Sequence, residues 1–377
     1  GQYRVYGQEN VYNHDFGLGD RYLSKEHFNR LNSCEIIPGD FVMSTMGTIG
    51  KCAIVPDSIQ CGIMDSHLIR LRIDGKKINP NYLLQLFSDQ YHYLSDQTAR
   101  LAVGGIMDGL SVGIVSNLSV IYPENLDEQN EIVSVLSDMD ETISNLQKLI
   151  RKKKDIRQGT MQMLVTGKKR LDGFSGDWVK INLAKNSRLK ARIGWQGLTT
   201  AEYLDEGYSY LITGTDFKDG HINWSGCHYV DYDRYAQDPN IQVSNGDLLL
   251  TKDGTIGKVA YISDLDRPAT LNSGVFAVKP ITNAYTAHFM FYVLESSVFK
   301  DFLQQLSAGS TINHLYQKDL VKFDLYVPPT TEEQETITGI LFDMDLDIYK
   351  LEEKLSKYQK IKQGMMEELL TGKVRLV

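Results

Sequence analysis

Two long stretches of the chain repeat apolar residues at alternating spacings of four and three. The apolar positions of the first stretch are Ile132, Leu136, Met139, Ile143, Leu146 and Ile150, and those of the second are Ile337, Leu341, Met344, Ile348, Leu351, Leu355, Tyr358, Met365 and Leu369. In the second stretch, only Lys362 interrupts the alternating spacing of apolar residues. Each stretch is therefore predicted to be a long helix that carries the a/d seam of a coiled coil.

The residues that flank both stretches support the same prediction. Each stretch follows a proline-containing turn and has acidic residues in its first turn, as the helix dipole favours. Each ends at Thr-Gly-Lys, where glycine can adopt the left-handed conformation that closes a helix. Because two seams in one chain bury each other most economically, we expect an antiparallel coiled coil of about 38 residues, roughly 57 Å long. The alternative is that each helix packs separately on its own domain.

An internal repeat organises the whole chain. Gly39-Asp40 and the sequence Gly-Thr-Ile-Gly-Lys at 47–51 recur 207 residues later, at 246–247 and 254–258. Further along the offset is 205, because Glu-Gln at 128–129 recurs at 333–334 and Thr-Gly-Lys at 166–168 recurs at 371–373. This agreement indicates a duplicated module. The stretch from 174 to 207 has no counterpart in the first copy, so we expect roughly 35 equivalent residues to be missing at the amino end, through truncation or lack of order.

The globular part of each copy precedes its helix. Residues 1–123 and 172–328 combine short β-rich runs, turns rich in Gly, Asn and Asp, and a few helical segments. Strands are predicted at 248–250, 259–262 and 275–278, and helices at 82–87 and 288–302. We therefore expect a mixed α+β fold in the α/β class, in which two repeated globular domains are separated by two long helices at 124–171 and 329–377.

Composition limits the classes of function. The chain is 42% apolar and 23% charged, as globular proteins are. No run approaches the roughly 20 apolar residues of a membrane helix, and the start carries no apolar signal core, so we expect a cytoplasmic protein. The four cysteines show no metal-ligand spacing and are expected to be reduced, structural thiols. A net charge of -8 argues against coating DNA through charge alone, but it allows a specific reader with local basic groups.

The repeated Gly-Thr-Ile-Gly-Lys invites comparison with a phosphate-binding loop. That pattern needs a glycine where this chain has Thr45 and Lys252, and a Ser or Thr where it has Cys52 and Val259. The sequence also precedes a predicted strand, not a helix whose amino end could bind an anion. Two interpretations stay open: a tight turn between strands, or a loop whose backbone and lysine approach a DNA phosphate. Because no nucleophile or metal-ligand motif stands out elsewhere, we expect no catalytic residue, metal or cofactor in this chain.

These motifs resemble the specificity (S) subunits of type I restriction-modification enzymes. The resemblance rests on Gly-Thr-Ile-Gly-Lys in each copy, Ser-Ala-Gly-Ser-Thr at 307–311, Glu-Gln at the start of each long helix, and Leu-x-Thr-Gly-Lys-x-Arg-Leu at each helix end. It covers essentially the whole chain. The first copy departs from the pattern at 104–107, where Gly-Gly-Ile-Met stands in place of the Gly-Ser-Thr-Ile at 309–312. This departure suggests different target sequences.

The resemblance implies a division of labour. Residues 1–123 and 172–328 would be target recognition domains, each reading one half of a bipartite site in double-stranded DNA. The helices would fix the unread spacer and dock two modification (M) subunits, which carry S-adenosylmethionine and methylate adenine at N6. Two restriction (R) subunits would add cleavage and translocation that depend on ATP and Mg. Two alternatives stay open: a coiled-coil scaffold that binds proteins and no DNA, and an S-type subunit of a type IIB restriction enzyme.

Residues that could contact DNA are predicted near the repeated elements, because base edges are read by polar and charged side chains. The candidates in the first copy are Ser44, Thr45, Thr48, Lys51, Ser66 and His67, and those in the second are Lys252, Asp253, Thr255, Lys258, Asn272, Ser273, Ser310, Thr311, Asn313 and His314. For each of them, ordinary turn capping is the competing interpretation.

Overall fold

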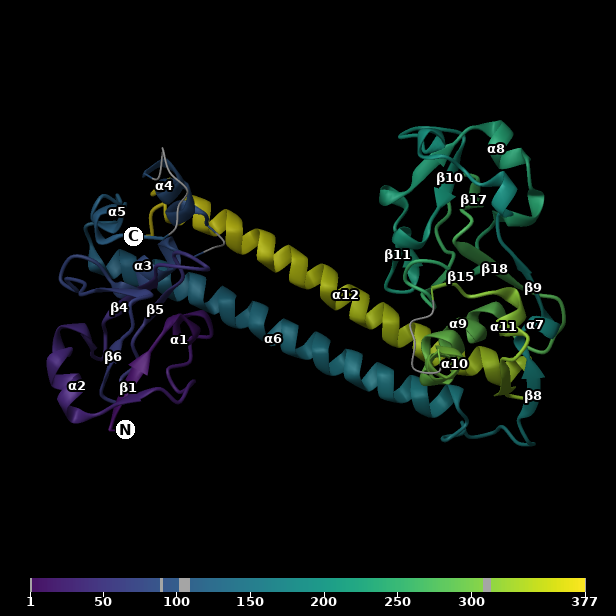
Figure 1. The fold of residues 1–377 in the computed structure, drawn as a ribbon, viewed down its shortest axis with the longest axis horizontal. Coiled ribbons are helices and arrows are strands. Elements are labelled where there is room, and N and C mark those ends of the chain that lie inside the picture. The colour runs from purple at the N-terminus through teal and green to yellow at the C-terminus, as the bar shows by residue number, and fades with distance from the viewer. Residues whose placement is uncertain (1, 89–90, 102–108, 308–312, 377) are drawn as a thin grey trace. The chain divides into compact units, whose positions relative to one another are not determined.

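Both stretches with alternating apolar spacing form long helices, α6 (Leu126–Val165) and α12 (Thr331–Leu369) (Figure 1). The computed structural model describes residues 2–88, 91–101, 109–307 and 313–376. The chain forms two units. Unit 1 comprises residues 1–149 and 351–377, and unit 2 comprises residues 150–350. Helix α6 therefore passes from unit 1 into unit 2, and α12 returns from unit 2 to unit 1.

Within each unit the two helices run antiparallel. The charged pairs that join them are Glu128–Arg375 and Asp140–Lys362 in unit 1, and Lys153–Asp347, Arg157–Asp345 and Arg170–Glu333 in unit 2. Residue numbers rise on one side of these pairs while they fall on the other, which defines the antiparallel direction. The alternative in which each helix packs only on its own domain therefore does not hold.

The seam positions are buried to different degrees. Ile132, Leu136 and Leu341 have no exposed surface, and Ile337 and Leu369 are almost fully buried. All five belong to the apolar core of a globular domain. The seam positions outside those cores are less enclosed: Ile143, Leu146, Ile150 and Ile348 keep a little exposed surface, and Leu351, Leu355 and Tyr358 keep more. Each helix is thus held by domain cores as well as by the other helix.

The described residues of unit 2 form two four-stranded sheets and two strand pairs. The first sheet has the order β13 (His228–Val230), β10 (Ser209–Ile212), β17 (Ala269–Leu271) and β14 (Gln242–Val243), with β10 and β17 parallel and the other pairings antiparallel. The second is antiparallel, in the order β16 (Val259–Tyr261), β15 (Leu248–Thr251), β18 (Val275–Pro280) and β9 (Ser187–Lys190). The antiparallel pairs are β8 (Val179–Asn182) with β19 (Asp324–Val327), and β11 (Phe217–Lys218) with β12 (His221–Ile222).

Unit 1 repeats this topology. Its first sheet has the order β2 (Tyr22–Leu23), β1 (Tyr3–Tyr6), β6 (Gly62–Met64) and β3 (Glu35–Ile36), again with only the central pair parallel. Its second sheet has the order β5 (Cys52–Ile54), β4 (Phe41–Ser44) and β7 (Leu68–Leu71). The mixed α+β fold with two repeated globular domains and two long helices is therefore confirmed.

The two copies differ where the sequence repeat has its gap. Strands β8 and β9 both lie in the stretch 174–207, which the first copy lacks. Strand β9 forms the fourth strand beside β18, whereas the equivalent sheet of unit 1 has three strands among the described residues. Strand β8 pairs with β19, whereas residues 119–122, which align with β19, form no strand.

Short helices complete both units. They are α1 (Gln8–Tyr12), α2 (Lys25–Arg30), α3 (Pro80–Leu86), α4 (Tyr93–Leu101) and α5 (Val112–Ser116) in unit 1, and α7 (Leu183–Asn186), α8 (Tyr232–Ala236), α9 (Ala287–Glu295), α10 (Ser297–Ser307) and α11 (Gln317–Leu320) in unit 2. Short 3-10 turns occupy Asn32–Cys34, Gly194–Gln196, Thr200–Glu202, Gly214–Asp216, Trp224–Gly226 and Pro239–Ile241. Among the described helices, none combines the length and the apolar character that a membrane crossing requires.

The single helix predicted at 288–302 is wrong in one respect, because the chain forms two helices there. Helix α9 ends before Ser296, and α10 begins directly after it. The Ser296 hydroxyl donates to the carbonyl oxygen of Val293 at 2.6 Å and accepts from the amide of Val298 at 3.2 Å. A serine that bonds to the backbone in this way ends one helix and starts the next.

The core of each unit joins its domain to both long helices. In unit 2, Phe289 of α9 packs in one cluster with Leu164 of α6 and Leu341 of α12. In unit 1, Leu86 of α3 packs in one cluster with Leu136 of α6 and the carboxyl end of α12. Because one apolar core includes all three elements, each domain is fixed on the helix pair by burial of apolar surface.

Candidate nucleic-acid interface

The repeated Gly-Thr-Ile-Gly-Lys forms the same strand-to-strand turn in both units, between β4 and β5 and between β15 and β16. Its two glycines have φ values of 65° and 81° in unit 1, and 67° and 84° in unit 2. These values lie in the left-handed region that glycine tolerates best. The backbone of the repeated sequence is therefore a tight turn between two strands. It leads into a strand and not into the amino end of a helix.

A buried hydroxyl closes each turn. The Ser44 hydroxyl donates to the carbonyl oxygen of Thr48 at 2.6 Å and accepts from the amide of Lys51 at 3.0 Å. In unit 2, the Thr251 hydroxyl makes the equivalent bonds, to Thr255 at 2.6 Å and from Lys258 at 2.9 Å. Ser44 and its neighbour Thr45 are buried, so their side chains support the turn from inside.

Three segments meet beside each turn. In unit 1, the amide of Thr45 donates to the carbonyl oxygen of His67 at 2.9 Å, and the amide of Leu110 donates to Thr45 at 2.8 Å. In unit 2, Lys252 takes the place of Thr45 and bonds to Gly274 and Leu315 at 2.9 and 2.8 Å. The backbone thus brings together the turn, the loop after β6 or β17, and the loop before α5 or α11.

In unit 2, five of the predicted residues form one polar group, which we call the Lys252 cluster: Lys252, Asp253, Asn272, Ser273 and His314. The Lys252 Nζ lies 3.6 Å from an Asp253 carboxylate oxygen and 3.4 Å from Nε2 of His314. Asp253 also pairs with Nδ1 of His314. The Asn272 Oδ1 accepts from the amide of Gly274 at 2.8 Å and from the Ser273 hydroxyl at 3.2 Å. The side chains of Lys252, Asp253 and His314 contact one another, and Asn272 and Ser273 adjoin them through Gly274, whose carbonyl oxygen accepts from the Lys252 amide at 2.9 Å.

The groups of the Lys252 cluster can donate and accept hydrogen bonds. Ammonium, amide and hydroxyl groups donate hydrogen bonds to base edges, and carboxylate, amide and hydroxyl oxygens accept them. The Lys252 side chain is only 13% exposed, and its Nζ also lies 5.5 Å from the centre of the Phe276 ring. These contacts restrict the position of the Lys252 ammonium group.

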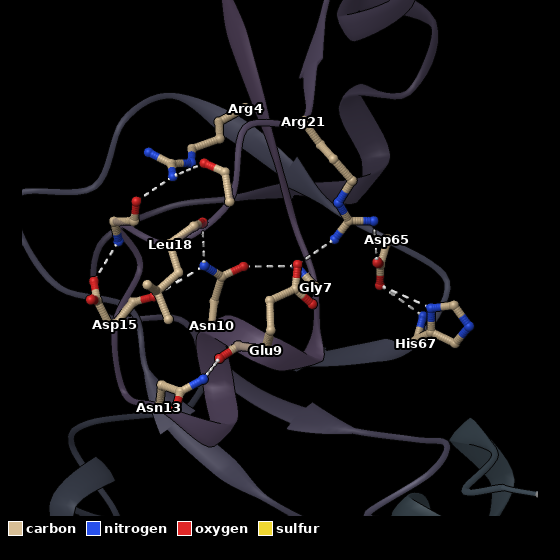
Figure 2. A network of polar contacts seen from close by, with 12 residues as sticks. Arg4, Gly7, Glu9, Asn10, Asn13, Asp15, Leu18, Arg21, Asp65 and His67 are labelled. Atoms are coloured by element: carbon tan, nitrogen blue, oxygen red, sulfur yellow. Dashed lines mark hydrogen bonds and ion pairs between the residues drawn. The ribbon is translucent and has the colours of Figure 1, made fainter. Parts of the chain in front are cut away.

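Unit 1 presents different side chains from the same backbone position. Asp65, which aligns with Asn272, accepts from the amide of His67 at 3.0 Å, just as Asn272 accepts from Gly274. Arg21 contacts Asp65 at 3.0 Å and Glu9 at 2.9 Å, and Figure 2 shows it lying between these two carboxylates. His67 is the one predicted residue in this network.

The other predicted residues are placed in three ways. Thr48, Ser66, Thr255 and Asn313 are exposed on the turns and adjoining loops. Lys51 and Lys258 line hollows beside the long helices, apart from the residues of the Lys252 cluster. Ser310 and Thr311 lie outside the described residues, as do the compared segments 104–107 and 309–312.

Several contact residues were not predicted from the sequence. Tyr203 bonds to the Asn272 amide, and the Tyr316 ring, which is half exposed, lies 4.3 Å from that of His314. In unit 1, the Tyr12 hydroxyl donates to the carbonyl oxygen of Thr48 at 3.1 Å. The repeat offset could have identified Asp65 through its alignment with Asn272. The tyrosines carry no such signal, because they come from segments that differ between the copies.

The Glu-Gln motif at the start of each long helix fixes the domain to that helix. Gln129 accepts from the amide of Asn79 at 2.7 Å and donates to the carbonyl oxygens of Lys77 and Pro123 at 2.9 and 2.7 Å. Gln334 makes the equivalent bonds, accepting from Thr286 at 2.9 Å and donating to Ala284 and Pro328 at 3.0 and 3.3 Å. The same three bonds in both units explain why this residue is repeated.

The glutamate of the motif contacts the other long helix. Glu128 pairs with Arg375 through two bonds of 2.6 Å, and Glu333 pairs with Arg170 at 2.9 and 2.8 Å. Each arginine belongs to the repeated sequence that follows a helix end. The Arg375 guanidinium holds the pKa of the Glu128 carboxyl below its usual value. The start of one helix is thereby joined to the end of the other.

The described residues contain no group of three or more His, Cys, Asp or Glu side chains that could hold a metal ion. Cys52 and Cys227 are buried, and burial raises the pKa of both thiols, to about 12 for Cys227. Such thiols stay protonated at neutral pH and are poor nucleophiles.

Comparison with known proteins points to one family. The family described as type I restriction modification DNA specificity domain matches residues 1–154 and 176–363. The specificity subunit of the type I restriction enzyme MjaVIII from Methanocaldococcus jannaschii is 25% identical over 330 residues, which are 84% of this chain and 75% of that protein.

Two solved structures share the fold. The S subunit of a type I restriction-modification system from M. genitalium matches with a TM-score of 0.59 and 16% identity, over 98% of this chain and 88% of that chain. A structure that concerns complex assembly and conformational transition of the type I R-M system matches with a TM-score of 0.54 and 18% identity, over 89% and 82% of the two chains.

Proposed function

Because the chain belongs to the family of type I restriction-modification DNA specificity proteins, we propose that it directs a methyltransferase and nuclease complex to a bipartite DNA site. Specificity subunits are the non-catalytic, DNA-recognising part of type I systems. Residues 1–123 and 172–328 act as target recognition domains, and each reads one half of the site in double-stranded DNA.

One observation carries the proposal of two different half-sites. The two units place unlike side chains on the same backbone scaffold: Asp65 aligns with Asn272, and Thr45 aligns with Lys252. A carboxylate only accepts hydrogen bonds, whereas an amide both donates and accepts. Since base edges differ in their pattern of donors and acceptors, unlike groups at equivalent positions favour unlike bases.

The helices and the partner subunits complete the proposal. A helix of 40 residues, the length of α6, spans about 60 Å, which suits a rod that bridges an unread spacer. The duplicated module gives equivalent surfaces to two copies of the same partner. We therefore propose two M subunits, which supply S-adenosylmethionine and adenine-N6 methylation, and R subunits, which supply ATP- and Mg-dependent cleavage.

Methylation mapping tests the proposal. The chain is co-expressed with the M subunit of its own operon, and methylated adenines are mapped across the host genome. We expect one motif with two short half-sites and a fixed spacer. A continuous motif, or no methylation together with no salt-dependent binding to duplex DNA, would contradict the proposal.

A single substitution tests the assignment of residues to half-sites. Asn272→Asp gives unit 2 the carboxylate of unit 1, and it should alter or abolish recognition of one half-site only. Asn245→Asp makes the same charge change on an exposed turn of unit 2 and should leave both half-sites unchanged. Altered recognition of both half-sites by Asn272→Asp would refute the assignment.

A further inference from the structure

Each unit contains a group of charged and polar residues where both long helices meet the globular domain. In unit 2, Arg157 of α6 bonds through Nε to Asp345 of α12 at 2.7 Å and through Nη2 to Glu295 of α9 at 2.7 Å. The Tyr292 hydroxyl of α9 donates to Asp345 at 2.8 Å. The Arg157 side chain is only 15% exposed. We call these four residues the unit 2 node.

Unit 1 contains the equivalent group. Lys362 of α12 pairs with Asp140 of α6 at 2.6 Å, and Gln85 of α3 donates to Asp140 at 3.2 Å. The Lys362 side chain is 3% exposed, whereas that of Asp140 is 42% exposed, so the buried member of the pair is the cation. We call Lys362, Asp140 and Gln85 the unit 1 node.

The two nodes are related by the internal repeat. Lys362 aligns with Arg157 and Asp140 aligns with Asp345 at the offset of 205, and Gln85 aligns with Tyr292 at the offset of 207. The cation therefore comes from α12 in unit 1 and from α6 in unit 2. This exchange is expected because α6 and α12 are copies of one helix and run antiparallel. Lys362, which interrupts the apolar rhythm of α12, is thus one half of a repeated ion pair.

An ion pair whose cation is buried is a poor source of stability but a strong constraint on geometry. Removal of both charges from water offsets most of their attraction, so an apolar pair of similar size is often at least as stable. An apolar seam, however, accepts a partner displaced by one heptad nearly as well as the correct one. A charge in the seam does not, because displacement leaves it buried without its partner.

Each node also includes the globular domain. The Tyr292 ring lies 5.4 Å from the Arg157 guanidinium, and Tyr292 is almost fully buried. Asp345 thus holds a group from α6 and a group from α9 at the same time. A shift of the domain along the helices would break both bonds together.

We propose that the two nodes are positioning groups that fix each recognition domain at one place on the helix pair, and that they thereby restrict the protein to a single spacer length. This inference rests on the proposed function, because it supposes a bipartite site whose spacer the helices span.

The test compares two double substitutions of the same kind. Lys362→Met with Asp140→Leu replaces the unit 1 node by apolar side chains. Lys153→Met with Asp347→Leu makes the same replacements at an ion pair of unit 2 whose side chains are 42% and 50% exposed. Each protein, in complex with the M subunit, is titrated with duplexes that carry both half-sites at the mapped spacing, or with about three base pairs more or fewer, the change that a displacement of one heptad would give.

The parent and the exposed-pair variant should prefer the mapped spacing by at least about ten-fold. The node variant should bind the mapped spacing as tightly but lose most of this preference. Lys362→Arg with Asp140 unchanged keeps the ion pair and should keep the preference of the parent. A node variant that keeps the full preference would overturn the inference, whereas a parent that binds no bipartite duplex would instead refute the proposed function.

A second variant keeps the test decisive if the node variant fails to fold. Arg157→Lys with Tyr292→Gln and Glu295→Ser gives the unit 2 node the residues of unit 1, because Ser88 aligns with Glu295. If the nodes have the same role, this protein keeps the spacer preference of the parent. Loss of the preference in a folded protein would show that the nodes are not equivalent and would contradict the inference.

Discussion

At the scale of single residues, Gln129 shows how one side chain joins helix α6 to the globular domain of unit 1. Its side chain is fully buried, and its amide group makes three hydrogen bonds to the backbone of two domain segments. An apolar side chain at this position would leave one amide and two carbonyl groups inside the protein without those partners. Unpaired buried groups are expensive because they also lose their bonds to water.

Gln129→Leu should therefore destabilise unit 1 by about 2–4 kcal/mol, the cost of one or two buried groups left unpaired. Chemical denaturation followed by circular dichroism measures this difference. Gln97→Leu is the matched control, because Gln97 also bonds to backbone groups, those of Ser119, but is only partly buried and makes these bonds at the surface. Equal effects of the two substitutions would show that burial of Gln129 does not matter.

The Glu128–Arg375 pair predicts a dependence of stability on pH. Because Arg375 lowers the pKa of Glu128 from its usual 4.5, the pair stabilises the fold above pH 4.5, and its contribution is lost as the pH falls through the lowered pKa. Arg375→Gln should thus lower the melting temperature at neutral pH, and this difference should shrink below pH 4.5. Arg30→Gln removes an exposed pair with Glu26 and should change little at any pH. A difference for Arg375→Gln that stays constant down to pH 3 would contradict the assignment.

At the scale of elements, the turns and long helices could be predicted because their signals are local. The alternating spacing predicts the seams, and the glycines of Thr-Gly-Lys have the expected positive φ, 69° at Gly167 and 71° at Gly372. The break at Ser296 could not be predicted, because the apolar pattern of α9 continues into α10 and only the serine's backbone bonds interrupt it.

Glycines in two different elements should respond oppositely to alanine. Gly254→Ala places a side chain at a φ of 67° in the repeated turn and should cost about 1–2 kcal/mol. Gly339→Ala adds a methyl group in α12, with no atom beyond the nearby backbone of the helix itself within 4 Å of the new carbon, and should stabilise by about 0.5–1 kcal/mol. Denaturant midpoints of the two variants provide the test, and effects of the same sign would refute this reading of the turn.

The pattern of apolar and polar residues does not predict contacts between residues that are distant in the sequence. Lys362 stands out in α12 as an interruption, but its partner Asp140 lies 222 residues away. The Lys252 cluster likewise joins residues of three segments, and only the fold shows that Asn272 and His314 approach the same turn. Sequence reasoning could select polar residues near repeated motifs, but it could not separate buried Ser44 from exposed Thr48.

At the scale of the whole molecule, the length of the two long helices should determine the number of spacer bases between the half-sites. Repeating residues 143–149 after Leu149 and residues 344–350 after Lys350 adds one heptad to each helix at the boundary between the units and keeps the seam in phase. Seven residues add about 10 Å, or about three base pairs of DNA.

The mapped methylation motif should therefore keep both half-sites and gain about three spacer bases. Insertion into α6 alone is the control, and it should disturb the antiparallel pairing and abolish methylation. Altered half-sites with an unchanged spacer would show that the helices do not set the separation.

The division of the chain between the units also bears on its synthesis. Unit 2 is a single continuous segment, residues 150–350, whereas unit 1 needs residues 351–377 beside residues 1–149. Domains generally fold as they leave the ribosome, the amino-terminal one first. Here the order is reversed, because Ile132 and Leu136 gain their partners Met366 and Leu369 only after all of unit 2 has been made. Residues 1–149 must wait for residues 351–377, so a chain cut off after residue 350 would have a complete unit 2 and an exposed apolar surface on unit 1.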